Sequence, residues 1–195
     1  GEVVRLNIGA GDSVIPGFTP LDAKTGDDAL SLPYDDGVVE EIYCSHTLEH
    51  IHHSLVPAAV KEWVRVLKPG GRIRICIPDF ERIDTERRAD PDKFSDQLYS
   101  SWMHGSHDVD TDRHRAWISD RWLEQMLRAN GIEEIGEWAP EYEDYSKLSR
   151  TLYRGGYKRK VEIPHNPKVV MVLSVPRFGP CDTFKSIADA CESLG

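Results

Sequence analysis

The sequence lacks any run of about twenty apolar residues, and no signal peptide opens it, so neither a membrane-spanning helix nor secretion is expected. Cysteine is scarce, and Cys44, Cys76, Cys181 and Cys191 form no CxxC pair. Buried free thiols in a reducing compartment are the expectation. These absences together predict a cytoplasmic protein with no membrane partner.

The sequence also has fewer basic than acidic residues. The chain has 24 Lys and Arg residues against 33 Asp and Glu, which gives a formal net charge of -9. Binding of nucleic acid depends largely on clustered Lys and Arg that neutralise phosphates. The excess of acidic over basic residues therefore argues against a nucleic-acid partner.

At 195 residues the chain is long enough to bury a sizeable core in one domain without disulfides. We expect that domain to span residues 1–177, followed by a tail over residues 178–195 that forms a short amphipathic helix. The chain starts at Gly1 rather than Met, which fits a processed or excised fragment with a fused or neighbouring domain.

Apolar, β-rich runs alternate with helical patterns along the chain. The expected strands are residues 3–8, 18–22, 38–45, 72–78, 132–138 and 168–175, and the expected helices are residues 56–67 and 120–129. This alternation predicts an α/β sandwich on a mainly parallel sheet. Residues 80–118 read as polar and irregular, and residues 141–167 read as an insertion-like loop.

The first strand ends at Gly9-Ala10-Gly11, a tight turn, and the second ends at the carboxylate of Asp22. Carboxyl ends of parallel strands meet on one side of a sheet, where such folds bind nucleotide-like ligands. Glycines at the turn remove side chains where the backbone must bend sharply and approach a ligand closely. The pattern predicts a nucleotide-type site at these strand ends.

Five segments occur in a characteristic order: LNIGAG, LPYDDG, IYCSHTLEHI, VKEWVRVLKPGGRIRICIPD and HRAWISDRWLEQMLRANGI. Together they resemble the class I methyltransferases that use S-adenosylmethionine, in the small bacterial-type branch (methyltransferase type 11-like) where SHxLEH follows the fourth strand. The resemblance covers residues 3–132. It implies a Rossmann-like fold with a mainly parallel seven-stranded sheet and an antiparallel last strand, and S-adenosylmethionine as cofactor.

The resemblance assigns the cofactor to residues at successive strand ends: Gly9, Ala10, Gly11, Asp22, Asp28, Ala29, Ser45 and His46. It implies that the glycine turn holds the methionine part and that Asp28, beside Ala29, meets the adenine amino group. The carboxylate of Asp22 can accept hydrogen bonds from both ribose hydroxyls. Taken singly, Gly9 and Gly11 also fit a plain turn, Asp28 a turn cap and Asp22 a solvated strand end.

The chain departs from the usual pattern after the first strand. Only nine residues lie between Ile8 and Phe18, and they include Pro16-Gly17. A crossover between parallel strands usually needs a dozen residues or more. We therefore expect the first crossover helix to be missing or reduced to a turn.

The segment SHTLEHIHH, residues 45–53, holds four histidines and an HxxEH pattern. Such a pattern in mid-helix is typical of zinc proteases, so a zinc-dependent hydrolase that uses His46, Glu49 and His50 is the first alternative function. Because a strand runs up to Ser45, we instead expect His46 to line the cleft and Glu49-His50 to begin a short helix. His52 and His53 are expected to be exposed.

The acceptor side of the cleft is predicted from a second polar cluster, residues 104–117. Methyl transfer is an in-line displacement, and an alcohol acceptor also needs a base within reach. His107 and His114 are the candidates, with Asp79 as a third. The expected reaction is O-methylation of a small-molecule or glycan-type acceptor.

Other interpretations of these residues remain open. The cluster also fits a solvated loop, or a set of ligands for a divalent ion made of His107, Asp110, Asp112 and His114. No metal site is assigned, because the spacing matches no firm signature. Residues 142–160, rich in Tyr, Lys and Arg, fit either a cover for a phosphate-bearing acceptor or a surface insertion packed on the domain. A non-catalytic cofactor-binding module is the second alternative function.

Overall fold

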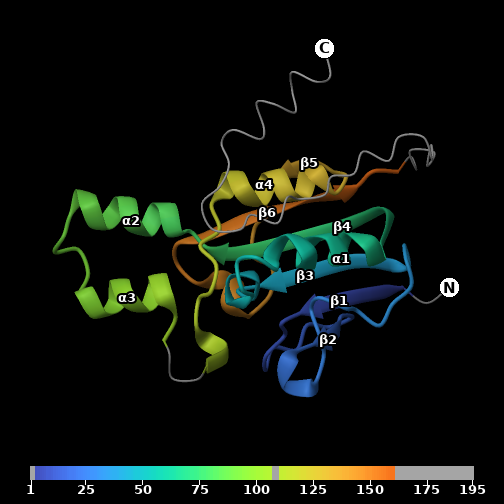
Figure 1. Cartoon of the computed structure of the whole chain (residues 1–195), viewed down its shortest axis with the longest axis horizontal. Coiled ribbons are helices and arrows are strands. Elements are labelled where there is room, and N and C mark those ends of the chain that lie inside the picture. Colours follow the sequence, from blue (N-terminus) through green and yellow to red (C-terminus); the bar gives the residue numbers. More distant parts are fainter. Residues whose placement is uncertain (1–2, 107–109, 161–195) are drawn as a thin grey trace, which may run out of the picture. The chain divides into compact units, whose positions relative to one another are not determined.

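The computed structural model describes residues 3–106 and 110–160, which form a six-stranded sheet with helices (Figure 1). The strands are β1 (Val4–Ile8), β2 (Thr19–Leu21), β3 (Val39–Ser45), β4 (Leu67–Pro78), β5 (Ile132–Gly136) and β6 (Thr151–Lys158). The helices are α1 (Val56–Val66), α2 (Phe80–Ala89), α3 (Asp96–His104) and α4 (Asp120–Ala129). Short 3₁₀ turns lie at Ala23–Thr25, Leu48–His50, Asp110–Asp112 and Tyr145–Lys147.

The strand order is β2-β1-β3-β4-β6-β5. The pairs β1–β2, β1–β3 and β3–β4 are parallel, whereas β6 runs antiparallel to both β4 and β5. The predicted α/β class with a mainly parallel sheet is confirmed. The expected last strand at residues 168–175, like the tail helix, lies outside the described residues.

Strand β4 carries the apolar core on one face. Ile73, Ile75 and Ile77 are fully buried, as the alternation in the sequence predicts. They belong to one hydrophobic cluster with the apolar stripe of α1, including Val60, Trp63 and Val64, and with inward residues of α4. Since α1 and α4 contact each other as well as the sheet, they cover the same face.

The opposite face of β4 carries Arg74, which is only 2% exposed. Its Nε lies 2.8 Å from Oε1 of Glu41, and its guanidinium lies over the rings of Tyr43, Trp138 and Tyr142. A buried charge needs such partners because removing it from water is costly. The segment after β5 thus packs on the sheet. For Tyr142, this agrees with the interpretation of residues 142–160 as a surface insertion whose tyrosines pack on the domain.

The prediction of a loop over residues 141–167 is wrong for residues 151–158, which form β6. The sequence analysis did not predict this strand because Gly155 and Gly156 interrupt the residue pattern that indicates a strand. Each is required by close packing: a Cβ on Gly155 would lie 2.5 Å from the carbonyl oxygen of Ile73, and one on Gly156 would lie 2.5 Å from that of Glu133.

The prediction that residues 80–118 are irregular is also wrong, because α2 and α3 lie there and extend away from the sheet in Figure 1. The two helices contact each other, and α3 buries no residue fully. Their N-caps are Asp79 and Ser95, whose side chains accept hydrogen bonds from Arg82 N and Leu98 N. Few apolar residues mark these helices, so no clear 3.6-residue period reveals them.

The predicted loss of the first crossover helix is confirmed. In the part of the chain that the structure describes, β1 and β2 pair in parallel and are joined by residues 9–18 without a helix. Cys44 and Cys76 are buried free thiols, as expected, and Cys181 and Cys191 lie outside the described residues. Among the described helices, none has the length and apolar character needed to span a bilayer.

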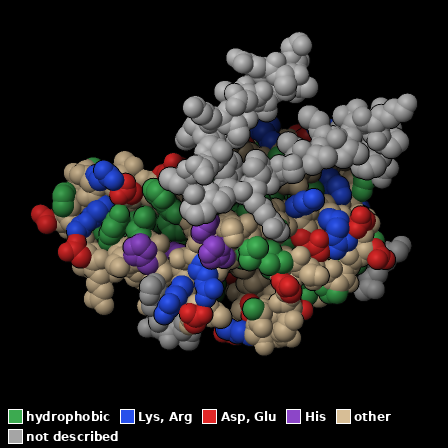
Figure 2. Space-filling model, in the orientation of Figure 1, with side chains coloured by type: hydrophobic (Ala, Val, Ile, Leu, Met, Phe, Trp, Pro, Cys, Tyr) green, Lys and Arg blue, Asp and Glu red, His purple; other side chains and the backbone are tan. Residues whose placement is uncertain are grey.

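Surface charge is mixed rather than segregated. On the face shown in Figure 2, acidic and basic side chains are interspersed, without a continuous basic patch among the described residues. Some charged side chains of the described residues pair within their own helix, such as Arg128 with Glu124 in α4 and Arg88 with Asp84 in α2. Ion pairs of this exposed kind contribute little to stability.

The packing of Gly155 generates a stability prediction. Gly155→Ala should lower the free energy of unfolding by about 1–3 kcal/mol, because the added methyl group must push the β4 backbone away. The matched control is Gly136→Ala in β5, where a Cβ would meet nothing within 4 Å. Urea denaturation of both variants measures the difference, and equal stability of the two would contradict the assigned β4–β6 packing.

Candidate functional site

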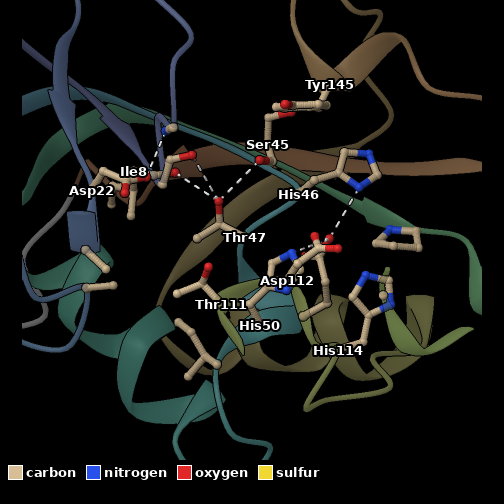
Figure 3. A pocket seen from close by; sticks show the side chains of 18 of the residues that line it. Ile8, Asp22, Ser45, His46, Thr47, His50, Thr111, Asp112, His114 and Tyr145 are labelled. Carbon is tan, nitrogen blue, oxygen red and sulfur yellow. Dashed lines mark hydrogen bonds and ion pairs between the residues drawn. The ribbon is translucent and has the colours of Figure 1, made fainter. Parts of the chain in front are cut away.

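A pocket of about 780 Å³ opens where the parallel strands β1, β2, β3 and β4 end (Figure 3). It is lined by residues of the glycine turn, of the segment that follows β2, and of the segment 45–51. Residues of the segments 101–106, 111–115 and 145–150 line it on the opposite side. This volume is typical of small-molecule and cofactor sites. The pocket lies at the end of the sheet where α/β folds bind ligands.

The glycine turn is shaped by Thr47, a contact that sequence reasoning missed. Gly9 and Gly11 have positive φ angles of 70° and 53°. A Cβ on Gly9 would lie 1.9 Å from Oγ1 of Thr47, so only glycine fits there. The backbone N–H groups of Gly9 and Ala10 both donate to the carbonyl oxygen of Leu21, which joins the turn to the end of β2.

Asp22 lies between the glycine turn and the segment that follows β2. Its Oδ2 accepts a hydrogen bond from Gly11 N at 2.8 Å, and its Oδ1 accepts one from Lys24 N at 2.9 Å. These bonds fix the carboxylate plane at the pocket wall. A carboxylate offers about four lone-pair positions, so each oxygen can accept a further hydrogen bond from a ligand hydroxyl.

Asp28 and Ala29 line the same end of the pocket. Oδ1 of Asp28 accepts a hydrogen bond from Leu30 N at 2.8 Å, so Asp28 does cap a turn, the alternative noted from the sequence. The carbonyl oxygen of Ala29 accepts a hydrogen bond from Nε1 of Trp63 at 2.8 Å. The core helix α1 therefore anchors this segment.

Ser45 and His46 line the pocket from the end of β3. His46 has a positive φ of 50°, an uncommon conformation for a non-glycine residue. Its Nε2 lies 3.1 Å from Oγ1 of Thr151, and its Nδ1 lies 3.3 Å from Oε1 of Glu49. The ring is thus held between β6 and a buried carboxylate.

The remaining predicted residues lie in different places. Ala10 is buried within the glycine turn, and Asp79 caps α2 while its N–H donates to the carbonyl oxygen of Arg150 at 2.7 Å. Neither is among the residues that line the pocket. His107 lies outside the described residues, whereas His114 does line the pocket.

Glu49 is the most deeply buried charged group of the pocket; the sequence analysis placed it in the first turn of a short helix or, in the zinc-hydrolase alternative, beside His46 and His50. The expected short helix is the 3₁₀ turn Leu48–His50, and Glu49 in it is 0% exposed. Burial alone would raise the pKa of Glu49, but contact with His46 and His50 outweighs burial and holds that pKa below its usual range. His52 and His53 are exposed, as predicted.

His114 approaches this carboxylate from the other side of the pocket. Its ring packs edge-on against the rings of His50 and Phe80, with ring centres 5.1 Å and 5.6 Å away. Burial lowers the pKa of His114, so its imidazole is neutral near pH 7. Figure 3 shows His46, His50, Asp112 and His114 at one end of the pocket and Asp22 at the other.

Arg150 reaches the pocket from the segment that precedes β6. Its guanidinium lies 4.6 Å from the centre of the Trp102 ring and 2.7 Å from Oε2 of Glu86. Hydrogen bonds from Arg82 and Arg150 lower the pKa of Glu86 to about 2. This pair joins α2 and α3 to the sheet beside the pocket.

Comparisons with known proteins agree with this geometry. A sequence model described as a methyltransferase domain matches residues 21–75. Demethylmenaquinone methyltransferase of Corynebacterium kroppenstedtii is 29% identical over 119 residues, which cover 56% of this chain and 49% of that protein. The chain therefore spans about half the length of this curated relative.

Solved structures show the same fold. An S-adenosylmethionine-dependent methyltransferase of Thermotoga maritima matches with a TM-score of 0.54 at 19% identity, over 82% of this chain and 84% of that one. A second, from Archaeoglobus fulgidus, matches with a TM-score of 0.53 at 15% identity, over 81% and 87%. At these identities the likeness establishes the Rossmann-like fold alone.

The Glu86–Arg150 pair generates a pH prediction. Since the pKa of Glu86 is lower in the folded chain than its unfolded value of 4.5, its stabilisation is present above that value and is lost as the pH falls toward about 2. Glu86→Gln should therefore be less stable at pH 7 and should lose less stability between pH 5 and pH 3 than the parent chain. Thermal unfolding at several pH values measures this, with Glu81→Gln on the same helix as control; parallel curves for Glu86→Gln and the parent would refute the assignment.

Proposed function

Because the chain belongs to the class I S-adenosylmethionine-dependent methyltransferases, we propose that it transfers the cofactor's methyl group to a hydroxyl of a small-molecule or glycan-type acceptor. The observation that carries the proposal is the joint position of the glycine turn and Asp22 at the strand ends, on the wall of one pocket. The methyl group leaves a positively charged sulfonium, so this enzyme class contributes alignment above all.

The cofactor would lie across the ends of β1, β2 and β3. The backbone of Gly9 and Gly11 would meet its methionine part, and the two oxygens of Asp22 would accept the ribose hydroxyls. Asp28 and Ala29 would contact the adenine, with Ser45 and His46 on the other side. Supporting this placement, hydrogen bonds to other segments hold Gly9, Gly11, Asp22, Ala29 and His46, and Asp28 is held by a hydrogen bond within its own turn.

The acceptor would occupy the end of the pocket where the histidines gather. Of the three candidates for activating its hydroxyl, His114 has the strongest support, because it lines the pocket and its lowered pKa leaves a neutral ring that can accept a proton. Asp79 has weaker support because its carboxylate caps α2. The zinc-hydrolase alternative receives no support, since the ring of His46 is engaged with Thr151 and Glu49.

An uncharged acceptor is favoured over a phosphorylated one. Arg150 is the basic side chain of residues 142–160 that lines the pocket, and it is already paired with Glu86. Binding a phosphate there would compete with this pair. A cytoplasmic location is part of the same proposal, because the buried free thiols Cys44 and Cys76 fit a reducing compartment.

The role of Asp22 can be tested without knowing the acceptor. Calorimetric titration with S-adenosylhomocysteine should show binding to the parent chain and a loss of about 100-fold in affinity for Asp22→Ala, since two hydrogen bonds to a charged group contribute roughly 1.5 kcal/mol each. Asp35→Ala, an exposed acid outside the pocket, is the control. No binding by the folded parent chain would refute the proposed function.

The glycine turn provides a second test. Gly9→Ala should abolish cofactor binding, because the new methyl group would collide with Thr47 and change the turn. Gly26→Ala separates this collision from backbone strain, since Gly26 also has a positive φ, of 90°, but a Cβ there would meet nothing within 4 Å. Calorimetry should show near-normal binding for Gly26→Ala; an equal loss in both variants would show that strain alone is responsible.

The non-catalytic alternative makes a different prediction from the same proteins. If the chain only binds the cofactor, S-adenosylhomocysteine would bind normally, but no acceptor would be methylated. A screen of hydroxyl-bearing acceptors with radiolabelled S-adenosylmethionine distinguishes the two. Label transfer that disappears in His114→Ala would favour the enzyme.

A further inference from the structure

Three side chains at the histidine end of the pocket point their ligand atoms toward one another. One atom each from Glu49, His50 and His114 lie within 4.8 Å of one another. They come from two separate segments, the 3₁₀ turn after β3 and the segment that precedes α4. Figure 3 shows the rings of His50 and His114 side by side in the pocket.

In each of the two imidazoles, hydrogen bonding leaves one ring nitrogen free to offer its lone pair to the space between Glu49, His50 and His114. Nδ1 of His50 lies 3.1 Å from the carbonyl oxygen of Arg113, which can only accept, so Nδ1 carries the proton. In the neutral ring Nε2 then has the lone pair, and it lies 3.9 Å from Oε1 of Glu49. The ring of His114 hydrogen-bonds the backbone of Met103, while its buried Nδ1 has no hydrogen-bond partner in the described residues.

Glu49 supplies the independent observation. It is fully buried, and within residues 3–106 and 110–160 neither of its carboxylate oxygens has a partner that meets hydrogen-bond geometry; the nearest charged neighbour is His46, whose Nδ1 lies 3.3 Å from Oε1. A buried carboxylate without such partners is costly unless a cation neutralises it. That cation is either a proton on a neighbouring histidine or a metal ion between the three groups.

We propose that Glu49, His50 and His114 bind one divalent transition-metal ion of the zinc class, with an open coordination position toward the pocket. Two imidazoles and one carboxylate are a ligand set found in catalytic zinc sites. Mg²⁺ and Ca²⁺ prefer oxygen ligands, so two imidazoles make either ion a poor match. The hydrogen bonds to the backbone of Arg113 and Met103 have the orienting role usual for ligand histidines. Tetrahedral ligands stand about 3.3 Å apart at metal–ligand distances of about 2.0 to 2.1 Å, so modest side-chain movement closes the site.

The catalytic use of this site rests on the proposed function, although the site itself does not. The open position can take the hydroxyl oxygen of the acceptor, whose pKa the metal lowers. The O–H proton passes to solvent, the oxygen bonds the methyl carbon, and the C–S bond breaks with its electron pair left on the sulfur of S-adenosylhomocysteine. With the metal bound, His114 would act on the acceptor as a metal ligand, and this role would replace the one that the proposed function gives to its free ring.

Metal titration tests the proposal without any acceptor. Chelator-washed protein should bind one equivalent of Co²⁺ with the visible absorption of a tetrahedral site, and Zn²⁺ should displace it. His50→Ala and Glu49→Gln should each weaken binding by about 100-fold or more. The matched control is the double variant His52→Ala and His53→Ala, which removes two exposed histidines outside the pocket and should bind Co²⁺ normally.

Each outcome bears on one proposal alone. Circular dichroism checks folding, and if the buried Glu49→Gln variant does not fold, His50→Ala, whose side chain is 21% exposed, decides. Failure to bind one equivalent, unchanged binding in His50→Ala, or equal loss in the His52/His53 control would overturn the metal site. Metal-free protein that still binds S-adenosylhomocysteine leaves the proposed function intact, whereas metal binding without cofactor binding overturns only that function.

Discussion

A carboxylate buried at the base of a polar pocket is the constraint on which the arrangement of the site depends. Glu49 has no exposed surface, so the groups around it must supply positive charge or hydrogen bonds. His46, directly after β3, and His50, in the same turn, face it, and its own backbone carbonyl accepts hydrogen bonds from Arg115 N at 2.7 Å and Ala116 N at 3.0 Å. One residue therefore positions both the turn after β3 and the segment that brings His114 to the pocket.

The cofactor half of the site could be predicted from the sequence because its signals are local. A strand that ends in Gly9 and Gly11, and a second that ends in Asp22, each follow from a few neighbouring residues, and parallel pairing then brings them to one end of the sheet. The missing crossover helix was predicted for the same reason, since the length of a connection is read directly from the chain. The structure adds that Asp22 is bound to the backbone of the glycine turn.

The rest could not be predicted because it depends on contacts between distant residues. Thr47 makes Gly9 necessary from 38 positions away, and the pairing of β6 with β4 makes Gly155 necessary from about eighty positions away. In the sequence alone a glycine pair interrupts a strand pattern. Likewise the role of Glu49 becomes visible only when His114, on another segment, is placed beside it.

The two outermost strands of the described sheet are poorly shaped for pairing with a strand of another molecule. β2 is only three residues long and contains Pro20, which cannot donate to a neighbouring strand. At the other side, β5 shifts register between Glu133 and Gly136, and Glu134 has a φ of 53°. A straight row of unpaired backbone groups, the template for edge-to-edge aggregation, is therefore interrupted at both margins, so the sheet resists extension by a second chain.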